Sequence, residues 1–118
     1  MKLNALRIPC KNLAEAEVYY LNMVGWQKTF GSIDEGYIGF DLSGITVILE
    51  PEEADEFECR RYLGFSVSIE NLDQFHLDAC DRGVEFTGPP ERQDWGGTMT
   101  HICDCSGNTF TVVEQRTT

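Results

Sequence analysis

The sequence predicts an α+β protein built from two tandem βαβββ modules, and three observations support this prediction. Residues 41–50 read DLSGITVILE and residues 104–115 read DCSGNTFTVVEQ, so one turn and one alternating run occur twice. Each half also contains an Asn-Leu pair followed by apolar residues at helical spacing. Segments around each helix alternate polar and apolar residues, as half-buried strands do. Such an echo within 118 residues indicates a duplicated module.

The predicted helices begin at Asn12 and Asn71. Each Asn is followed three residues later by Glu or Gln, which is the capping-box pattern. Apolar residues then recur on one face of each helix: Leu13, Ala16, Tyr20 and Val24 in the first, and Leu72, Phe75 and Ala79 in the second. Gly25 and Gly83 are expected to end these helices as left-handed caps. Each helix should therefore bury one stripe against a sheet.

The expected strands are residues 6–8, 26–30, 37–40 and 45–49 in the first half, and 65–69, 84–86, 98–103 and 109–113 in the second. The second half has the longer loop, GPPERQDWGG, whose Pro-Pro and Gly-Gly pairs predict an ordered loop without helix or strand. We expect one domain over residues 1–118. It consists of module 1 (residues 3–50), an acidic linker (51–61) and module 2 (62–115).

The charge balance excludes some partners. Twenty acidic and nine basic residues give a net charge of −11, which repels nucleic acids and anionic lipid surfaces. Six of the acids lie in EPEEADEFE, residues 50–58, which is either a solvated linker or a surface that docks cations. The sequence shows no secretory signal and no apolar run of membrane-spanning length, so we expect a cytoplasmic protein without membrane partners.

The cysteines are expected to be reduced and to pack as small apolar residues. There are five without CxxC spacing, at Cys10, Cys59, Cys80, Cys103 and Cys105. An odd set in a chain without a secretory signal argues against a disulfide framework. His76, beside the apolar stripe of the second helix, is expected at the surface or its boundary.

The turn before the last strand indicates a family. Asp104, Gly107 and Asn108 keep three letters of the D-P-D-G-N turn found in the glyoxalase/bleomycin-resistance/extradiol-dioxygenase superfamily, also called vicinal oxygen chelate proteins. With its two βαβββ modules and two Asn-Leu helix starts, the chain resembles this superfamily over residues 3–115. The resemblance implies a curved eight-stranded, cup-shaped mixed sheet with helices outside, and a homodimer.

The resemblance also locates the family's divalent-metal ligands, which are His or Glu on the first and last strands of each module. The corresponding positions here are Ala5, Val47, Gly64 and Thr111. Val47 is placed from Thr111 by the offset of 64 residues between Glu50 and Glu114. None of the four side chains is a metal ligand of that kind, so no metal cofactor is expected. The alternative is an unconventional set of His101, Cys103 and Cys105, although one short strand cannot surround an ion by itself.

Strand parity predicts the lining of the cup once Ala5 and Gly64 face inward. The expected inward residues are Arg7, Val47, Leu49, Ser66, Ser68, Met99, His101, Cys103, Thr109, Thr111 and Val113. The candidate substrate-binding residues are Arg7, Ser66, Ser68, Trp95, Met99 and Thr111. A mixture of apolar and polar groups is typical of small-molecule sites.

Three of these side chains have two interpretations each. Arg7, as a buried or half-buried fork, holds a carboxylate or phosphate, or it pairs with Glu70 or Glu114. His101 is the candidate general base because an imidazole titrates near neutrality, or it is a hydrogen-bonded strand histidine without catalysis. Trp95 is a lid over the cup, or it seals a dimer contact.

The leading functional hypothesis is metal-independent small-molecule binding, of the antibiotic-sequestering type. Bleomycin-resistance proteins are metal-free acidic dimers that hold a cationic drug, and the charge of −11 would attract such a ligand. The alternative is a lyase-, isomerase- or dioxygenase-like enzyme of the superfamily that uses His101 and Arg7 or an unconventional metal site. In a third reading the chain is a scaffold or regulatory partner with a vestigial cup.

Overall fold

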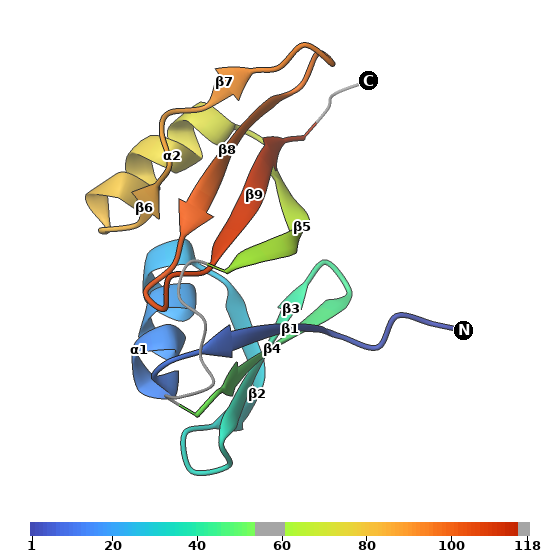
Figure 1. Cartoon of the computed structure of the whole chain (residues 1–118), viewed down its shortest axis with the longest axis vertical. Coiled ribbons are helices and arrows are strands. Elements are labelled where there is room, and N and C mark those ends of the chain that lie inside the picture. The colour runs from blue at the N-terminus through green and yellow to red at the C-terminus, as the bar shows by residue number, and fades with distance from the viewer. Residues whose placement is uncertain (54–60, 116–118) are drawn as a thin grey trace. The chain divides into compact units, whose positions relative to one another are not determined.

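A computed structural model describes residues 1–53 and 61–115, and its contacts divide the chain into two units, Met1–Cys59 and Arg60–Thr118. Both units are drawn in Figure 1. Each contains the elements of one βαβββ module, which confirms the predicted α+β class. Residues 54–60, which are most of the predicted linker, lie outside the described residues.

Unit 1 is a four-stranded mixed sheet with one helical segment. Its elements are β1 (Leu6–Cys10), α1 (Leu13–Val18), the π-helix η1 (Tyr19–Val24), β2 (Gln27–Ser32), β3 (Tyr37–Leu42) and β4 (Ile45–Pro51). The strand order is β1-β4-β3-β2, in which β1 and β4 are parallel and the other pairs are antiparallel. The parallel pair follows from the helical crossover between β1 and the hairpin strands.

The first helix begins and ends as predicted but changes type midway. The Asn12 side chain accepts a hydrogen bond of 3.0 Å from the backbone N–H of Glu15, and Gly25 has φ of 93° in the left-handed region. Its second half is a π-helix, in which the Gly25 N–H reaches back to the Tyr20 carbonyl at 3.0 Å. The wider turn buries both Tyr19 and Tyr20, and Tyr20 packs against Trp26 with ring centroids 4.6 Å apart.

The register of β4 corrects one prediction about the lining of the cup. Val47 and Leu49 pair with Leu6 and Ile8, are fully buried and belong to the face that packs against α1. Their predicted inward orientation is therefore wrong, and Ile48 shares the other face with Arg7. The repeat offset was one residue too long, and a slip of one residue moves a strand side chain to the opposite face.

Unit 2 is a five-stranded mixed sheet with one α-helix (Figure 1). Its elements are β5 (Tyr62–Ile69), α2 (Leu72–Asp81), β6 (Glu85–Phe86), β7 (Glu91–Arg92), β8 (Thr98–Cys103) and β9 (Thr109–Glu114). The order is β5-β9-β8-β6, with β5 parallel to β9 and β7 paired to β8. The Asn71 side chain caps α2 by accepting from the Gln74 N–H at 3.2 Å, as predicted.

The long loop of unit 2 was predicted without any strand, and this is wrong for β7. Glu91 and Arg92 pair with Met99 and Thr98, and the hairpin is closed by a 2.7 Å bond from the Gln93 N–H to the Gly97 carbonyl. The two glycines that indicated a loop, Gly96 and Gly97, lie at the tip of this hairpin. The described strands therefore form a four-stranded and a five-stranded sheet, where eight strands in total were predicted.

The repeated Asp-x-Ser-Gly turn is a structural element, and it is most elaborate between β8 and β9. Asp104 is buried, and its Oδ1 accepts hydrogen bonds of 2.9 Å from the backbone N–H groups of Ser106 and Asn108. Its Oδ2 accepts a third bond of 3.0 Å from the Asn108 side chain. The first and last residues of the family turn, Asp104 and Asn108, are therefore hydrogen-bonded to each other.

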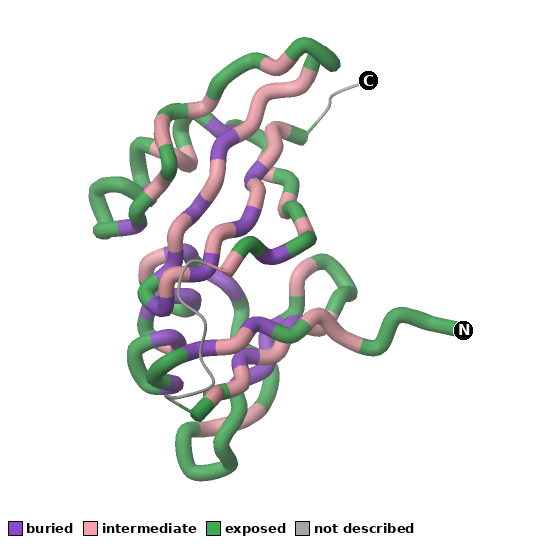
Figure 2. The backbone as a smooth tube through the Cα atoms, in the orientation of Figure 1, coloured by how far each residue is buried: buried purple, intermediate pink, exposed green. Residues whose placement is uncertain are grey.

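Buried residues concentrate on the central strands of each sheet and on the helix faces that cover them (Figure 2). Among the described residues, no helix combines the length and the apolar character needed to cross a bilayer.

Candidate functional site

The sheet of unit 2 has one buried and one accessible face. The buried face carries Leu63, Thr100, Ile102, Phe110 and Val112. The other face, called here the accessible face, carries Ser66, Ser68, Met99, His101, Cys103, Thr109, Thr111 and Val113, all exposed or half-buried. The predicted parity is therefore correct for β5, β8 and β9, and the functions assigned to these residues stay predictions.

Three polar side chains form one row across this face. Ser66 on β5 pairs with Thr111 on β9, and Thr111 pairs with His101 on β8. Neighbouring strands lie about 4.8 Å apart, so these side chains are adjacent although they are far apart in the sequence. The row brings together three of the residues that the sequence singled out.

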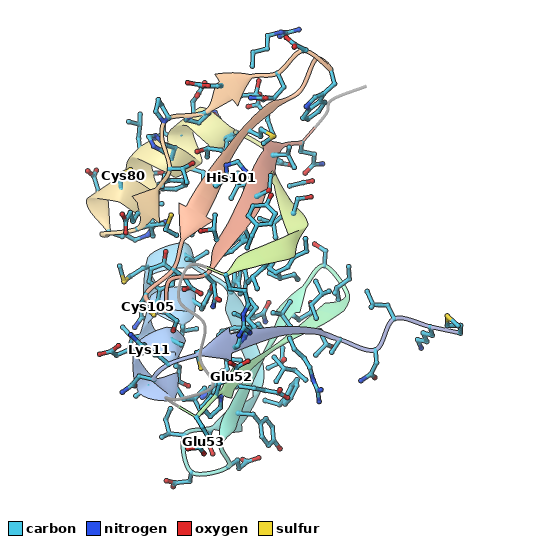
Figure 3. The ribbon with its side chains drawn as sticks, in the orientation of Figure 1. Lys11, Glu52, Glu53, Cys80, His101 and Cys105 are labelled. Atoms are coloured by element: carbon cyan, nitrogen blue, oxygen red, sulfur yellow. The ribbon has the colours of Figure 1, made fainter. Side chains whose placement is uncertain are left out.

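Two further side chains contact this row. The Tyr62 hydroxyl and the Thr111 Oγ1 form a hydrogen bond of 2.7 Å, and the Tyr62 and His101 rings have centroids 6.0 Å apart. The Thr87 Oγ1 lies 3.4 Å from the His101 Nδ1, which orients the imidazole. Figure 3 labels His101 in the sheet of unit 2.

Sequence reasoning missed both Tyr62 and Thr87. Tyr62 has the same parity as Gly64 and Ser66, so extending the predicted strand backwards would have found it. Thr87 lies just beyond β6, and its backbone N–H donates to the His101 carbonyl at 3.0 Å. That position depends on the pairing of β6 with β8, for which the sequence gives no signal.

Met99 and Trp95 lie near the start of β8, where this strand follows the tip of the β7–β8 hairpin. Met99 pairs with Val113 on the accessible face, which adds an apolar patch beside the polar row. Trp95 is 54% exposed at the hairpin tip. Its ring lies on the backbone of Gly97, where an added Cβ would be 1.9 Å from a ring carbon. The hairpin itself therefore positions Trp95, and the lid and dimer-contact interpretations stay predictions.

Arg7 belongs to unit 1, and its partner differs from the predicted ones. Its Nε lies 3.2 Å from the Glu50 Oε1, and the two side chains are 70% and 40% exposed. Glu114, one of the two expected partners, instead accepts from the backbone N–H of Leu72 at 3.3 Å. The predicted burial of Arg7 is also wrong. Adjacent parallel strands place Glu50 on the same face, and an exposed pair of this kind contributes at most about 1 kcal/mol.

The positions expected for metal ligands carry no imidazole or carboxylate. Gly64 is exposed, Thr111 is bonded to Tyr62, and Ile48 takes the position that the sequence had assigned to Val47. Within residues 1–53 and 61–115, no three His, Cys, Asp or Glu side chains gather closely enough to hold an ion. His101 and Cys103 share the accessible face, whereas Cys105 lies in the following turn.

The cysteines differ in environment. Cys10 is 1% exposed in the core of unit 1, as the packing interpretation predicts. Cys80 and Cys105 are exposed, so that interpretation is wrong for them. Cys59 lies outside the described residues.

No family sequence model matches the chain, and no curated protein matches it. Several solved structures, in contrast, match the chain over nearly its whole length. A member of the glyoxalase/bleomycin resistance protein/dioxygenase superfamily from Sphaerobacter thermophilus is 27% identical, with a TM-score of 0.78 over 94% of this chain and 96% of that one. The chain has the fold of this superfamily. The resemblance inferred from the Asp-x-x-Gly-Asn turn is thereby confirmed at the level of the fold.

Two further solved structures cover nearly the whole chain. TnmS3, an antibiotic binding protein from Streptomyces sp. CB03234, is 16% identical with a TM-score of 0.80, over 98% of this chain and 97% of its own. A fosfomycin resistance protein from Listeria monocytogenes is 18% identical with a TM-score of 0.77, over 98% and 94%. At these identities the likeness concerns the fold alone.

Proposed function

We propose that the chain binds a small organic molecule on the accessible face of unit 2, and that it does so without a divalent metal. The observation that supports this most is the polar row of Ser66, Thr111 and His101, contacted by Tyr62 and Thr87. Hydroxyl and imidazole groups both donate and accept hydrogen bonds, so such a row suits a ligand with several neutral polar groups.

The surroundings of the row narrow the chemistry of the ligand. Met99 and Val113 place an apolar surface next to the polar groups, so the ligand would combine an apolar body with hydroxyl, carbonyl or amide groups. The net charge of −11 favours neutral or cationic molecules over anions. Antibiotics are the first class to screen, because an antibiotic binding protein and a fosfomycin resistance protein share the fold.

A second candidate is a lyase- or isomerase-type enzyme of the same superfamily. It is favoured by the contact between the Thr87 Oγ1 and the His101 Nδ1, which holds the imidazole in a defined orientation beside the Tyr62 ring. A base held in this way would accept a proton from a bound substrate. Incubation with each ligand found, followed by mass spectrometry, distinguishes the two: a binding protein returns its ligand unchanged.

The binding test is a thermal-shift screen of chelator-treated protein against an antibiotic panel, followed by calorimetric titration of any compound that stabilises it. A ligand at a hundredfold excess over its dissociation constant adds about 2.7 kcal/mol of stability, which shifts the melting temperature measurably. Addition of Zn²⁺ or Mn²⁺ should leave the dissociation constant unchanged. A ligand that binds only after metal is added contradicts the proposal.

Two variants locate the site. Thr111→Val removes the hydroxyl in the middle of the row, and His101→Gln removes the imidazole. Each should weaken binding about five- to twelvefold, because one hydrogen bond contributes about 1 to 1.5 kcal/mol. The control is Asp81→Asn, an exposed change on α2. If all three variants bind like the parent protein, the ligand sits elsewhere.

A further inference from the structure

A histidine and a cysteine lie one turn apart on α2, away from the accessible face. His76 and Cys80 are four residues apart and therefore neighbours on the helix surface. The His76 Nε2 is 3.6 Å from the Cys80 Sγ. Cys80 is exposed and is labelled on α2 in Figure 3.

The imidazole of this pair is held in place. The His76 ring packs edge-on against the Phe86 ring, with centroids 4.6 Å apart and an angle of 67° between the planes. Phe86 is itself fixed in β6, which pairs with β8. The imidazole is therefore held by the Phe86 ring while its Nε2 lies 3.6 Å from the Cys80 Sγ.

The separation of 3.6 Å is the one that a shared metal ion requires. Zinc binds an imidazole nitrogen at about 2.0–2.1 Å and a thiolate sulfur at about 2.3 Å. At a tetrahedral angle these bond lengths place nitrogen and sulfur about 3.6 Å apart. A cation can thus bond to both atoms with little movement of either side chain.

We propose that His76 and Cys80 form a two-ligand surface site for a borderline or soft divalent cation such as Zn²⁺ or Cd²⁺, with solvent completing the coordination. Imidazole and thiolate ligands select such ions over Mg²⁺ or Ca²⁺. Binding displaces the thiol proton to solvent, so affinity rises with pH. In the described part of the chain no third His, Cys, Asp or Glu side chain joins the pair.

The charge of the helix favours a cation at this site. Residues 72–81 read LDQFHLDACD, so α2 carries Asp73, Asp78 and Asp81 and neither Lys nor Arg. These exposed carboxylates raise the local concentration of divalent cations without coordinating them. The site is separate from the ligand row on the sheet, so either can be present without the other.

The first experiment needs no mutation. Reduced, chelator-treated protein is alkylated with iodoacetamide in the presence and absence of Zn²⁺, and each cysteine peptide is followed by mass spectrometry. We expect Zn²⁺ to slow the alkylation of Cys80 more than that of Cys105, the other exposed cysteine described. Equal protection of the two thiols, or none at Cys80, would overturn the proposal.

Variants then test whether the imidazole takes part. Cd²⁺ is titrated into the protein while the cadmium–thiolate charge-transfer absorption is recorded. The parent and Cys105→Ser should bind one equivalent at this site. His76→Gln and Cys80→Ser should bind at least about tenfold more weakly, because each loses the second donor of a chelate. A His76→Gln protein that remains folded and binds Cd²⁺ as tightly as the parent refutes the shared site.

Discussion

The Asp104 carboxylate is predicted to be a major determinant of the stability of unit 2, and Asp104→Ala tests this. The change removes the acceptor for two backbone N–H groups at 2.9 Å and for the Asn108 side chain at 3.0 Å. Asp104, Ser106 and Asn108 are 7%, 5% and 0% exposed, so water cannot readily replace the lost oxygens.

The expected magnitude follows from these contacts. A hydrogen bond to a charged group contributes about 1.5 to 3 kcal/mol, and three such bonds on one carboxylate are not additive. We therefore expect Asp104→Ala to lower the free energy of unfolding by about 3 to 5 kcal/mol. This is a large fraction of the roughly 5 to 15 kcal/mol by which a domain is normally stable.

The duplicated turn provides a matched control within the same chain. Asp41 occupies the equivalent position in unit 1, but it is exposed and accepts one long bond of 3.4 Å from the Gly44 N–H. Asp41→Ala should therefore cost less than about 1 kcal/mol. Both variants are compared with the parent by urea unfolding followed by circular dichroism. Equal losses for the two variants, or a loss below about 1.5 kcal/mol for Asp104→Ala, would refute the assignment.

Two further predictions concern unit 1. Gly31 has φ of 87°, and a Cβ there would lie 2.3 Å from the Tyr37 carbonyl oxygen, whereas Gly36 has φ of 89° and open space around it. Gly31→Ala should therefore cost more than about 2 kcal/mol in unfolding experiments and Gly36→Ala only about 1; equal costs would contradict the predicted clash. The Tyr37 hydroxyl donates to Glu35 at 2.9 Å, and this bond, with the carboxylate charge, raises the pKa of Tyr37. Its contribution to folding is complete below the ordinary phenol pKa and is lost as pH rises through the folded one, so Glu35→Gln should lower the pKa measured by NMR titration. An unchanged Tyr37 pKa would mean that Glu35 is not the cause.

The elements that sequence analysis located correctly are those with a local physical signal. The caps at Asn12 and Asn71 were predictable because each satisfies an amide three residues away. The parity of β5, β8 and β9 was predictable because polar and apolar residues alternate there, and only one face of the sheet is buried. Ser66, Thr111 and His101 were therefore assigned to one face from sequence.

The errors occur where that local signal is weak. Residues 45–49 read ITVIL, in which Thr46 is the one polar residue, so the alternation of polar and apolar residues is too weak to decide whether Val47 or Ile48 faces the helix. The choice of Val47 then depended on the offset of 64 residues between the two halves, which is one residue too long for this strand. The strand β7 was missed because two residues are too few to show alternation.

By itself the sequence determined the duplicated βαβββ module, its helix starts and the residues of one sheet face, because these depend on neighbours within a few positions. Only the tertiary structure decided which of these residues meet. Register between strands placed Arg7 beside Glu50 and Tyr62 on Thr111, and the pairing of β6 with β8 brought Thr87 to His101. These contacts join residues that are distant in the chain, and their geometry depends on the packing of the whole sheet.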